Sequence, residues 1–200
     1  MDYNFALMKN LGPFLAAAFV LAAVPSPAAD KDITIFGAVQ YEEKLTFQSA
    51  TQAGTTLSTF DPGTFSTFGV RFGHGNVVGG EHTIAYVPNF IDTKSKAVVY
   101  TSNFLLQAPL PKAKPYATVG LGSFFSFGSG LGDLGSKFAL NYGGGVKVLP
   151  AGPVGLRLDI RGYAIPGVRF TGPGVTGVSP SKQTMNILEA GIGIIFSLGK

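Results

Sequence analysis

One ten-residue stretch decides the fold: Val154-Gly155-Leu156-Arg157-Leu158-Asp159-Ile160-Arg161-Gly162-Tyr163. Apolar side chains occupy every second position from its start, and charged side chains lie between them. This period of two predicts a β-strand with one apolar face and one charged face. The stretch is longer than an average globular strand of about five or six residues, and it matches a tilted membrane strand of about 9–11 residues.

The same alternation recurs in seven further segments, which cover residues 33–41, 65–72, 81–90, 97–107, 116–125, 138–148 and 185–198. Together they predict an all-β fold, an eight-stranded antiparallel up-and-down transmembrane β-barrel. In lipid every strand edge must be hydrogen-bonded, so the sheet closes on itself. The apolar rows then face outward and the polar rows inward. In the third segment, Ile84, Tyr86 and Phe90 are expected to face outward.

The connecting segments alternate in length. Residues 42–64, 126–137 and 164–184 form long connections rich in Gly, Ser, Thr and Pro, whereas the connection at 149–153 is short. Outer-membrane barrels have long external loops and short periplasmic turns. With the N-terminus in the periplasm, all three long connections fall on the external side. The external link at 91–96 is short and departs from the pattern.

The composition departs from that of a soluble domain. The chain has 200 residues, with 28 Gly, 17 Phe and 7 Tyr, and only 13% of its residues are charged. An average soluble protein carries about 25% charged residues. The net charge of +4 is mild and the basic residues are scattered, which argues against a nucleic-acid binder. Because Cys is absent, disulfides and thiolate metal sites are excluded.

An export signal is expected at the N-terminus. The apolar run at 11–24 follows Lys9, and small residues at 28 and 29 offer a cleavage site. Translation is expected to start at Met1 or Met8. The sequence therefore divides into a signal peptide over residues 1–29 and an outer-membrane β-barrel domain over residues 30–200.

The polar rows are expected to fill the barrel. A barrel of about eight strands has an interior that side chains can close, and an unpaired charge there is costly. Charges of both signs therefore predict a paired structural network, made of Arg71, Asn103, Lys147, Arg157, Asp159, Arg161 and Glu189. The aromatic residues of the apolar rows are expected to face lipid, and these are Tyr41, Phe68, Tyr86, Tyr100, Phe104, Phe125 and Tyr142.

Four stretches also carry a family resemblance: 86–90 (YVPNF), 114–122 (KPYATVGLG), 141–147 (NYGGGVK) and 154–163. They resemble the outer-membrane β-barrel domain family of small bacterial porin-like proteins, related in architecture to the transmembrane part of OmpA. The likeness spans most of residues 32–198 and implies an eight-stranded outer-membrane barrel. It implies little about activity, because such barrels serve as adhesins, tethers or resistance factors. Many members end on an aromatic residue, whereas here four residues follow Phe196.

Other candidate sites carry weaker signals. His74 and His82 are the only histidines, and both flank a turn expected at the periplasmic rim. Their spacing lacks the pattern of a metal site, and a lipid hydrolase with a Ser-His-acid triad would need them at the external rim. The Gly-rich segment at 128–132 lacks the Lys-Ser/Thr pair of a nucleotide-binding loop. No catalytic, cofactor-binding or metal-ligating residue is predicted.

The sequence thus predicts a non-enzymatic integral protein of the outer membrane, with a structural or surface-interaction role. Outer-membrane lipid and the barrel-assembly machinery are its expected partners. The alternatives are a narrow channel for small solutes and, with less support, a lipid-modifying enzyme. A soluble periplasmic lipocalin-like barrel is the competing fold, and it would turn the apolar rows inward.

Overall fold

The computed structural model describes residues 30–43, 45–51, 54–60, 63–129, 134–149, 152–168 and 182–198. The predicted signal peptide at 1–29 lies outside these residues. The described part of the chain is built from β-strands and their connections and contains no α-helix. Within it, no helix has the length and hydropathy that crossing a bilayer requires.

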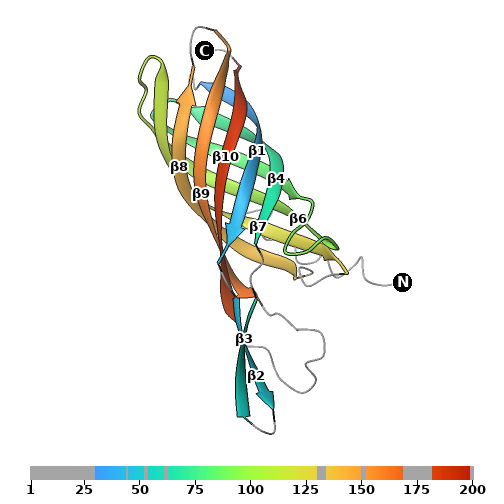
Figure 1. Ribbon diagram of the computed structural model, residues 1–200. Helices are drawn as coiled ribbons and strands as arrows, with labels where there is room; N and C mark the ends of the chain where they lie inside the picture. The colour runs from blue at the N-terminus through green and yellow to red at the C-terminus, as the bar shows by residue number, and fades with distance from the viewer. Residues whose placement is uncertain are drawn as a thin grey trace, which may run out of the picture.

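Eight strands close into one antiparallel barrel (Figure 1). Each strand pairs with its neighbour along the chain, and β1 pairs with both β10 and β4, which closes the ring. This confirms the predicted fold class. The barrel strands are β1 (Lys31–Glu42), β4 (Thr64–Gly75), β5 (Val78–Val87), β6 (Ser95–Gln107), β7 (Ala113–Gly128), β8 (Gly135–Val148), β9 (Val154–Val168) and β10 (Gln183–Ser197).

The barrel has two distinct ends. We call the end where β1 begins and β10 ends the terminal rim, and the opposite end the hairpin rim (Figure 1). Short connections at 76–77, 108–112 and 149–153 join strands at the terminal rim. The connections at 43–63, 88–94, 129–134 and 169–182 join strands at the hairpin rim, and each of them is longer than those at the terminal rim.

The first long connection is not a simple loop. It contains a two-stranded antiparallel sheet of β2 (Leu45–Thr51) and β3 (Gly54–Phe60), which hangs below the barrel in Figure 1. The sequence interpretation treated residues 42–64 as a connection without strands. Thr and other β-branched residues favour strands, and the Thr-rich composition of this segment supports a local hairpin.

Large apolar side chains cover the outside of the barrel wall, and the charged residues of the 154–163 stretch lie inside. Ile160 is 64% exposed, whereas its neighbours Arg161 and Asp159 are 0% and 3% exposed. This is the arrangement predicted for a transmembrane barrel and the opposite of a lipocalin-like one. Highly exposed members of the outer surface include Ile35, Phe68, Val119, Tyr142, Ile160, Leu188 and Ile192.

The prediction for Phe90 is wrong. Strand β5 ends at Val87, and Phe90 lies in the connection that follows. The alternation therefore stops before Phe90, whose side chain is fully buried in the barrel. Its neighbour Asn89 is exposed.

Candidate functional site

The candidate site is a charged cluster inside the barrel, which we call the interior network. It joins three guanidinium groups to three carboxylates, and all six side chains are fully buried. The cations come from strands β4 and β9, and the anions from β5, β9 and β10. Its members are Arg71, Arg157, Arg161, Glu81, Asp159 and Glu189.

Asp159 lies at the centre of the interior network. Its Oδ2 accepts a hydrogen bond from Nη1 of Arg71 at 2.6 Å. The same carboxylate lies 3.2 Å from Nε of Arg157 and 3.2 Å from Nη2 of Arg161. The Tyr116 hydroxyl donates a further hydrogen bond to Oδ1. One carboxylate therefore joins side chains from three strands.

Two further carboxylates complete the charge balance. Glu81 lies 2.6 Å from Nη2 of both Arg157 and Arg161. Glu189 accepts hydrogen bonds from Arg71 at 2.8 Å and from the Gln40 amide at 2.7 Å. Equal numbers of opposite charges offset the desolvation cost that each group would carry alone.

Aromatic rings cover the flanks of two guanidinium groups. The guanidinium carbon of Arg71 lies 3.6 Å from the centre of the Phe36 ring, and that of Arg157 lies 4.6 Å from the centre of the Tyr116 ring. Such cation–π contacts stabilise a desolvated guanidinium. The arginines are therefore held from the side as well as by their carboxylate partners.

Two predicted members lie outside the interior network. Lys147 binds Oδ2 of Asp32 at 2.6 Å, closer to the terminal rim. Asn103 donates a hydrogen bond to the Thr101 hydroxyl at 3.0 Å, and it is the direct cross-strand partner of Glu81. The other five predicted residues, Arg71, Arg157, Asp159, Arg161 and Glu189, come together in the network.

Sequence reasoning missed Glu81 and Tyr116. Glu81 opens the predicted strand at 81–90 and shares the inward row of Thr83 and Ala85, but it was not included in the predicted network. Tyr116 shares the inward row of Thr118 in the same way. Extending each row backward by two residues would have found both.

An apolar cluster fills the interior on the side of the hairpin rim. We call it the apolar cap. The Phe90 ring lies 5.5 Å from the Phe65 ring and 4.7 Å from the Phe124 ring, centre to centre. The interior is thus charged in its middle and apolar towards one end. The other large members of the cap are Val87, Ile91, Tyr163, Ile165, Val168, Met185 and Ile187.

Glu42 is an unpaired carboxylate beside the apolar cap. It lies at the end of β1, opposite Ile187, and its side chain is fully buried. Among the described residues, neither of its carboxylate oxygens has a hydrogen-bond partner. A buried acceptor without a partner is costly, so Glu42 destabilises the folded barrel.

Replacing Glu42 by Leu is expected to raise the free energy of unfolding by about 1–3 kcal/mol, because an unsatisfied buried group is removed. Urea unfolding of the refolded barrel in detergent, followed by circular dichroism, measures the change. The matched control is Glu43→Leu, since Glu43 is exposed and its loss should change stability by about 0.5 kcal/mol or less. A lower stability for Glu42→Leu than for the control would contradict this assignment.

His82 is an unexpected polar residue on the outside of the wall. His82 was expected at a rim, but it lies in the middle of β5 and faces outward. Its Nδ1 lies 3.0 Å from the Tyr100 hydroxyl, and Ser102 is its direct partner on β6. Over the described strands no carboxylate shares this outer face, since Glu81 points inward to the arginines. A Ser-His-acid triad is therefore incomplete here.

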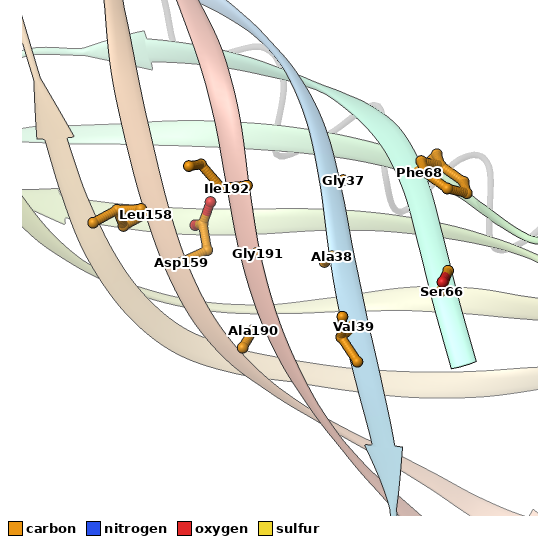
Figure 2. Close-up of a pocket in the computed structure, with 10 residues that line it drawn as sticks. All are labelled: Gly37, Ala38, Val39, Ser66, Phe68, Leu158, Asp159, Ala190, Gly191 and Ile192. Atoms are coloured by element: carbon orange, nitrogen blue, oxygen red, sulfur yellow. The ribbon is translucent and has the colours of Figure 1, made fainter. Parts of the chain in front are cut away.

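A shallow depression of about 620 Å³ also lies on the outer wall, across β1, β4, β9 and β10 (Figure 2). Small residues form part of it, including Gly37, Ala190 and Gly191, and Phe68 stands at its edge. Asp159 is its one charged residue, and that carboxylate is already bound by arginines. The depression therefore offers mainly apolar contacts.

No group of three or more potential metal ligands of the His, Cys, Asp or Glu type occurs among the described residues. Each charged side chain of the interior network has a partner of opposite charge within it. Nε of Arg71 and Nη1 of Arg157 have no hydrogen-bond partner among the described residues, and the mutual pairing of the six charges is that expected of a structural network.

Comparisons with known proteins agree on the architecture. Neisserial surface protein A covers 86% of this chain and 100% of its own, with 12% identity and a TM-score of 0.58. The outer membrane protein OprG from Pseudomonas aeruginosa covers 86% and 97%, with 14% identity and a TM-score of 0.62. At such identities the likeness shows the fold, that of small eight-stranded outer-membrane barrels. No protein-family model and no curated protein sequence matches the chain.

Proposed function

We propose that this chain is a non-enzymatic integral protein of the bacterial outer membrane, closed to solute flow, with a structural or surface-interaction role. One observation carries the proposal: the exposed side chains of the wall are apolar while the interior holds the paired charges. The predicted signal peptide and delivery by the barrel-assembly machinery belong to the same proposal.

The apolar wall argues for lipid as its surroundings. Ile160, Ile192 and Phe68 are each more than half exposed, and each would gain about 1.5–3 kcal/mol on leaving water. Soluble proteins rarely expose apolar patches larger than a few hundred Å². A wall that is apolar around eight strands is stable only against acyl chains.

The hairpin rim is the natural place for contacts outside the membrane. The longer connections and the β2–β3 hairpin gather there (Figure 1). With both chain termini of the barrel at the terminal rim, the hairpin rim faces the cell exterior in the usual orientation of such barrels. The surface-interaction role is therefore assigned to this end.

Cell fractionation tests the location. We expect the protein in the detergent-extracted outer membrane, as a band whose gel mobility changes on heating because the closed barrel unfolds only when heated. Surface protease on intact cells should cleave within residues 42–64 and spare the short connections. A soluble periplasmic band that lacks heat modification would refute membrane insertion.

Conductance separates the proposal from its channel alternative. The interior network and the apolar cap block the lumen, so purified barrels in planar bilayers are expected to give no steady ion conductance. Replacing Phe90 and Phe124 by Ala should leave the bilayer silent as well, because the arginine–carboxylate network still spans the interior. Steady single-channel steps from the wild-type barrel would favour the channel.

A further inference from the structure

The outer wall carries a row of polar side chains near the terminal rim, which we call the outer polar strip. It consists of Lys31, His74, His82, Tyr100 and Ser102, one or two from each of β1, β4, β5 and β6. All five occupy outward positions of their strands. Elsewhere in the middle of the wall the outward rows are dominated by large apolar residues.

Strand register makes the strip continuous. Lys31 is the direct partner of His74, and His82 is the direct partner of Ser102. Direct partners in an antiparallel sheet have Cβ atoms about 4.5–5.5 Å apart, and diagonal neighbours about 7–8 Å. His74 and His82 are diagonal neighbours across β4 and β5.

A glycine lets the two histidines approach. Gly80 lies opposite His74, and a Cβ atom on Gly80 would lie 2.6 Å from Nε2 of His74. The Nε2 edge of the His74 ring therefore occupies the space that a side chain at residue 80 would fill. Beyond it, the His82 ring stacks on the Tyr100 ring at 6.2 Å with an interplanar angle of 12°.

Lys31 forms the cationic end of the strip. Lys31 is exposed, and no carboxylate in the described part of the chain lies within ion-pair distance of it. The nearby Asp30 and Asp32 bind Lys114 and Lys147 instead. The strip thus presents an ammonium group at the rim and hydrogen-bonding groups deeper in the wall.

We propose that the outer polar strip binds an acidic glycerophospholipid. The phosphate lies between Lys31 and His74 at the rim, and an ester carbonyl accepts a hydrogen bond at His82 or Tyr100. Neighbouring strands lie about 4.8 Å apart, so these two places are separated by about 10 Å, within reach of one head group and its glycerol. Adjacent Phe72 and Phe104 line the path of the acyl chains.

Charge and depth favour this ligand over a neutral lipid. A polar side chain in an apolar wall is costly unless a partner satisfies it. His82 and Tyr100 lie within hydrogen-bond distance of each other through Nδ1 and the hydroxyl, and lipid is the partner available to their remaining donors and acceptors. A lysine near the membrane surface attracts anionic head groups by about 1 kcal/mol. The inference rests on the proposed membrane insertion of the barrel.

Native mass spectrometry of the full-length barrel, refolded in a non-ionic detergent, tests the site. The probes are dioleoylphosphatidylglycerol and dioleoylphosphatidylcholine at equal concentration. We expect the wild type to retain phosphatidylglycerol in preference, and the triple variant Lys31→Gln, His74→Phe, His82→Phe to retain at least fivefold less. Phe keeps an aromatic ring at both histidine positions, including the one stacked on Tyr100.

The matched control is Lys96→Gln, which removes an outward, exposed lysine at the hairpin rim. It should leave phosphatidylglycerol retention unchanged. Equal retention by the triple variant and the wild type, or equal loss in the control, would overturn the proposed site. Heat-dependent gel mobility is recorded for every sample, so a barrel that inserts but shows no lipid preference refutes only the lipid site. A wild type that fails to insert refutes the proposed function itself.

Discussion

Replacing Asp159 by Asn is expected to lower the free energy of unfolding by about 3–5 kcal/mol, because removing one partner of a buried ion pair leaves uncompensated charge. Asp159 contacts Arg71, Arg157 and Arg161 together. Its neutralisation leaves three guanidinium groups facing the two remaining carboxylates of the interior network. Asn keeps the shape of the side chain, so the loss reports charge rather than packing.

Urea unfolding in detergent micelles, followed by circular dichroism and heat-dependent gel mobility, measures this loss. The matched control is Asp30→Asn, since Asp30 pairs with Lys114 at 2.8 Å but both side chains are partly exposed. An exposed pair contributes about 1 kcal/mol or less. If Asp159→Asn and Asp30→Asn lose equal stability, the interior network does not hold the barrel together.

A double variant tests whether Arg71 and Asp159 stabilise the barrel through each other. Substituting Arg71 by Met together with Asp159→Asn removes a cation and an anion at once. Buried ion pairs replaced by apolar groups often cost little, so the double variant should recover part of the stability lost by Asp159→Asn alone. Full additivity of the two losses would mean that the two residues do not interact.

The strands and their two faces were predictable from the sequence, because a period of two assigns each side chain to one face. Arg157, Asp159 and Arg161 alternate with Leu156, Leu158 and Ile160, and no reading other than a strand explains that order. The structure turns the first row inward and the second outward.

The pairing inside the barrel was not predictable. Arg71 meets Asp159 and Glu189, which are 88 and 118 residues away along the chain. Which side chains meet across the lumen depends on the stagger of the closed sheet and on side-chain length, and neither is encoded in a local pattern. Glu81 is an example. The sequence assigns it to an inward row, but it does not show that Glu81 pairs with Arg157 and Arg161.

The apolar cap escaped prediction for a different reason. Sequence reasoning assigned apolar rows to the outside, yet Phe65, Phe90 and Phe124 pack inside the barrel. Where the alternation ends, or where both faces of a strand are apolar, the sequence does not show whether an apolar residue points inward or outward. The β2–β3 hairpin was missed because its many Thr and Ser residues are equally common in loops.

Replacing Ile160 by Arg is expected to destabilise the membrane-inserted barrel by about 2–4 kcal/mol, the cost of an arginine facing lipid near the bilayer midplane. Ile160 is the most exposed large apolar residue of the wall, at 64%. In a water-soluble barrel the same exposure would make the substitution nearly neutral, within about 0.5 kcal/mol. The measurement is urea unfolding of barrels folded into phospholipid vesicles.

The control for this experiment is the same substitution at a position nearer the membrane surface. Val154 faces outward on the same strand but lies at its start, at the terminal rim, and is 48% exposed. Arginine near the membrane interface costs about 0–1 kcal/mol, so Val154→Arg should lose much less stability than Ile160→Arg. Both substitutions add one positive charge to the same strand. A difference between their losses of stability therefore reflects how far each position lies from the membrane surface. Equal, small losses at both positions would mean that water and not lipid surrounds the wall, and the outward apolar row would then need another explanation.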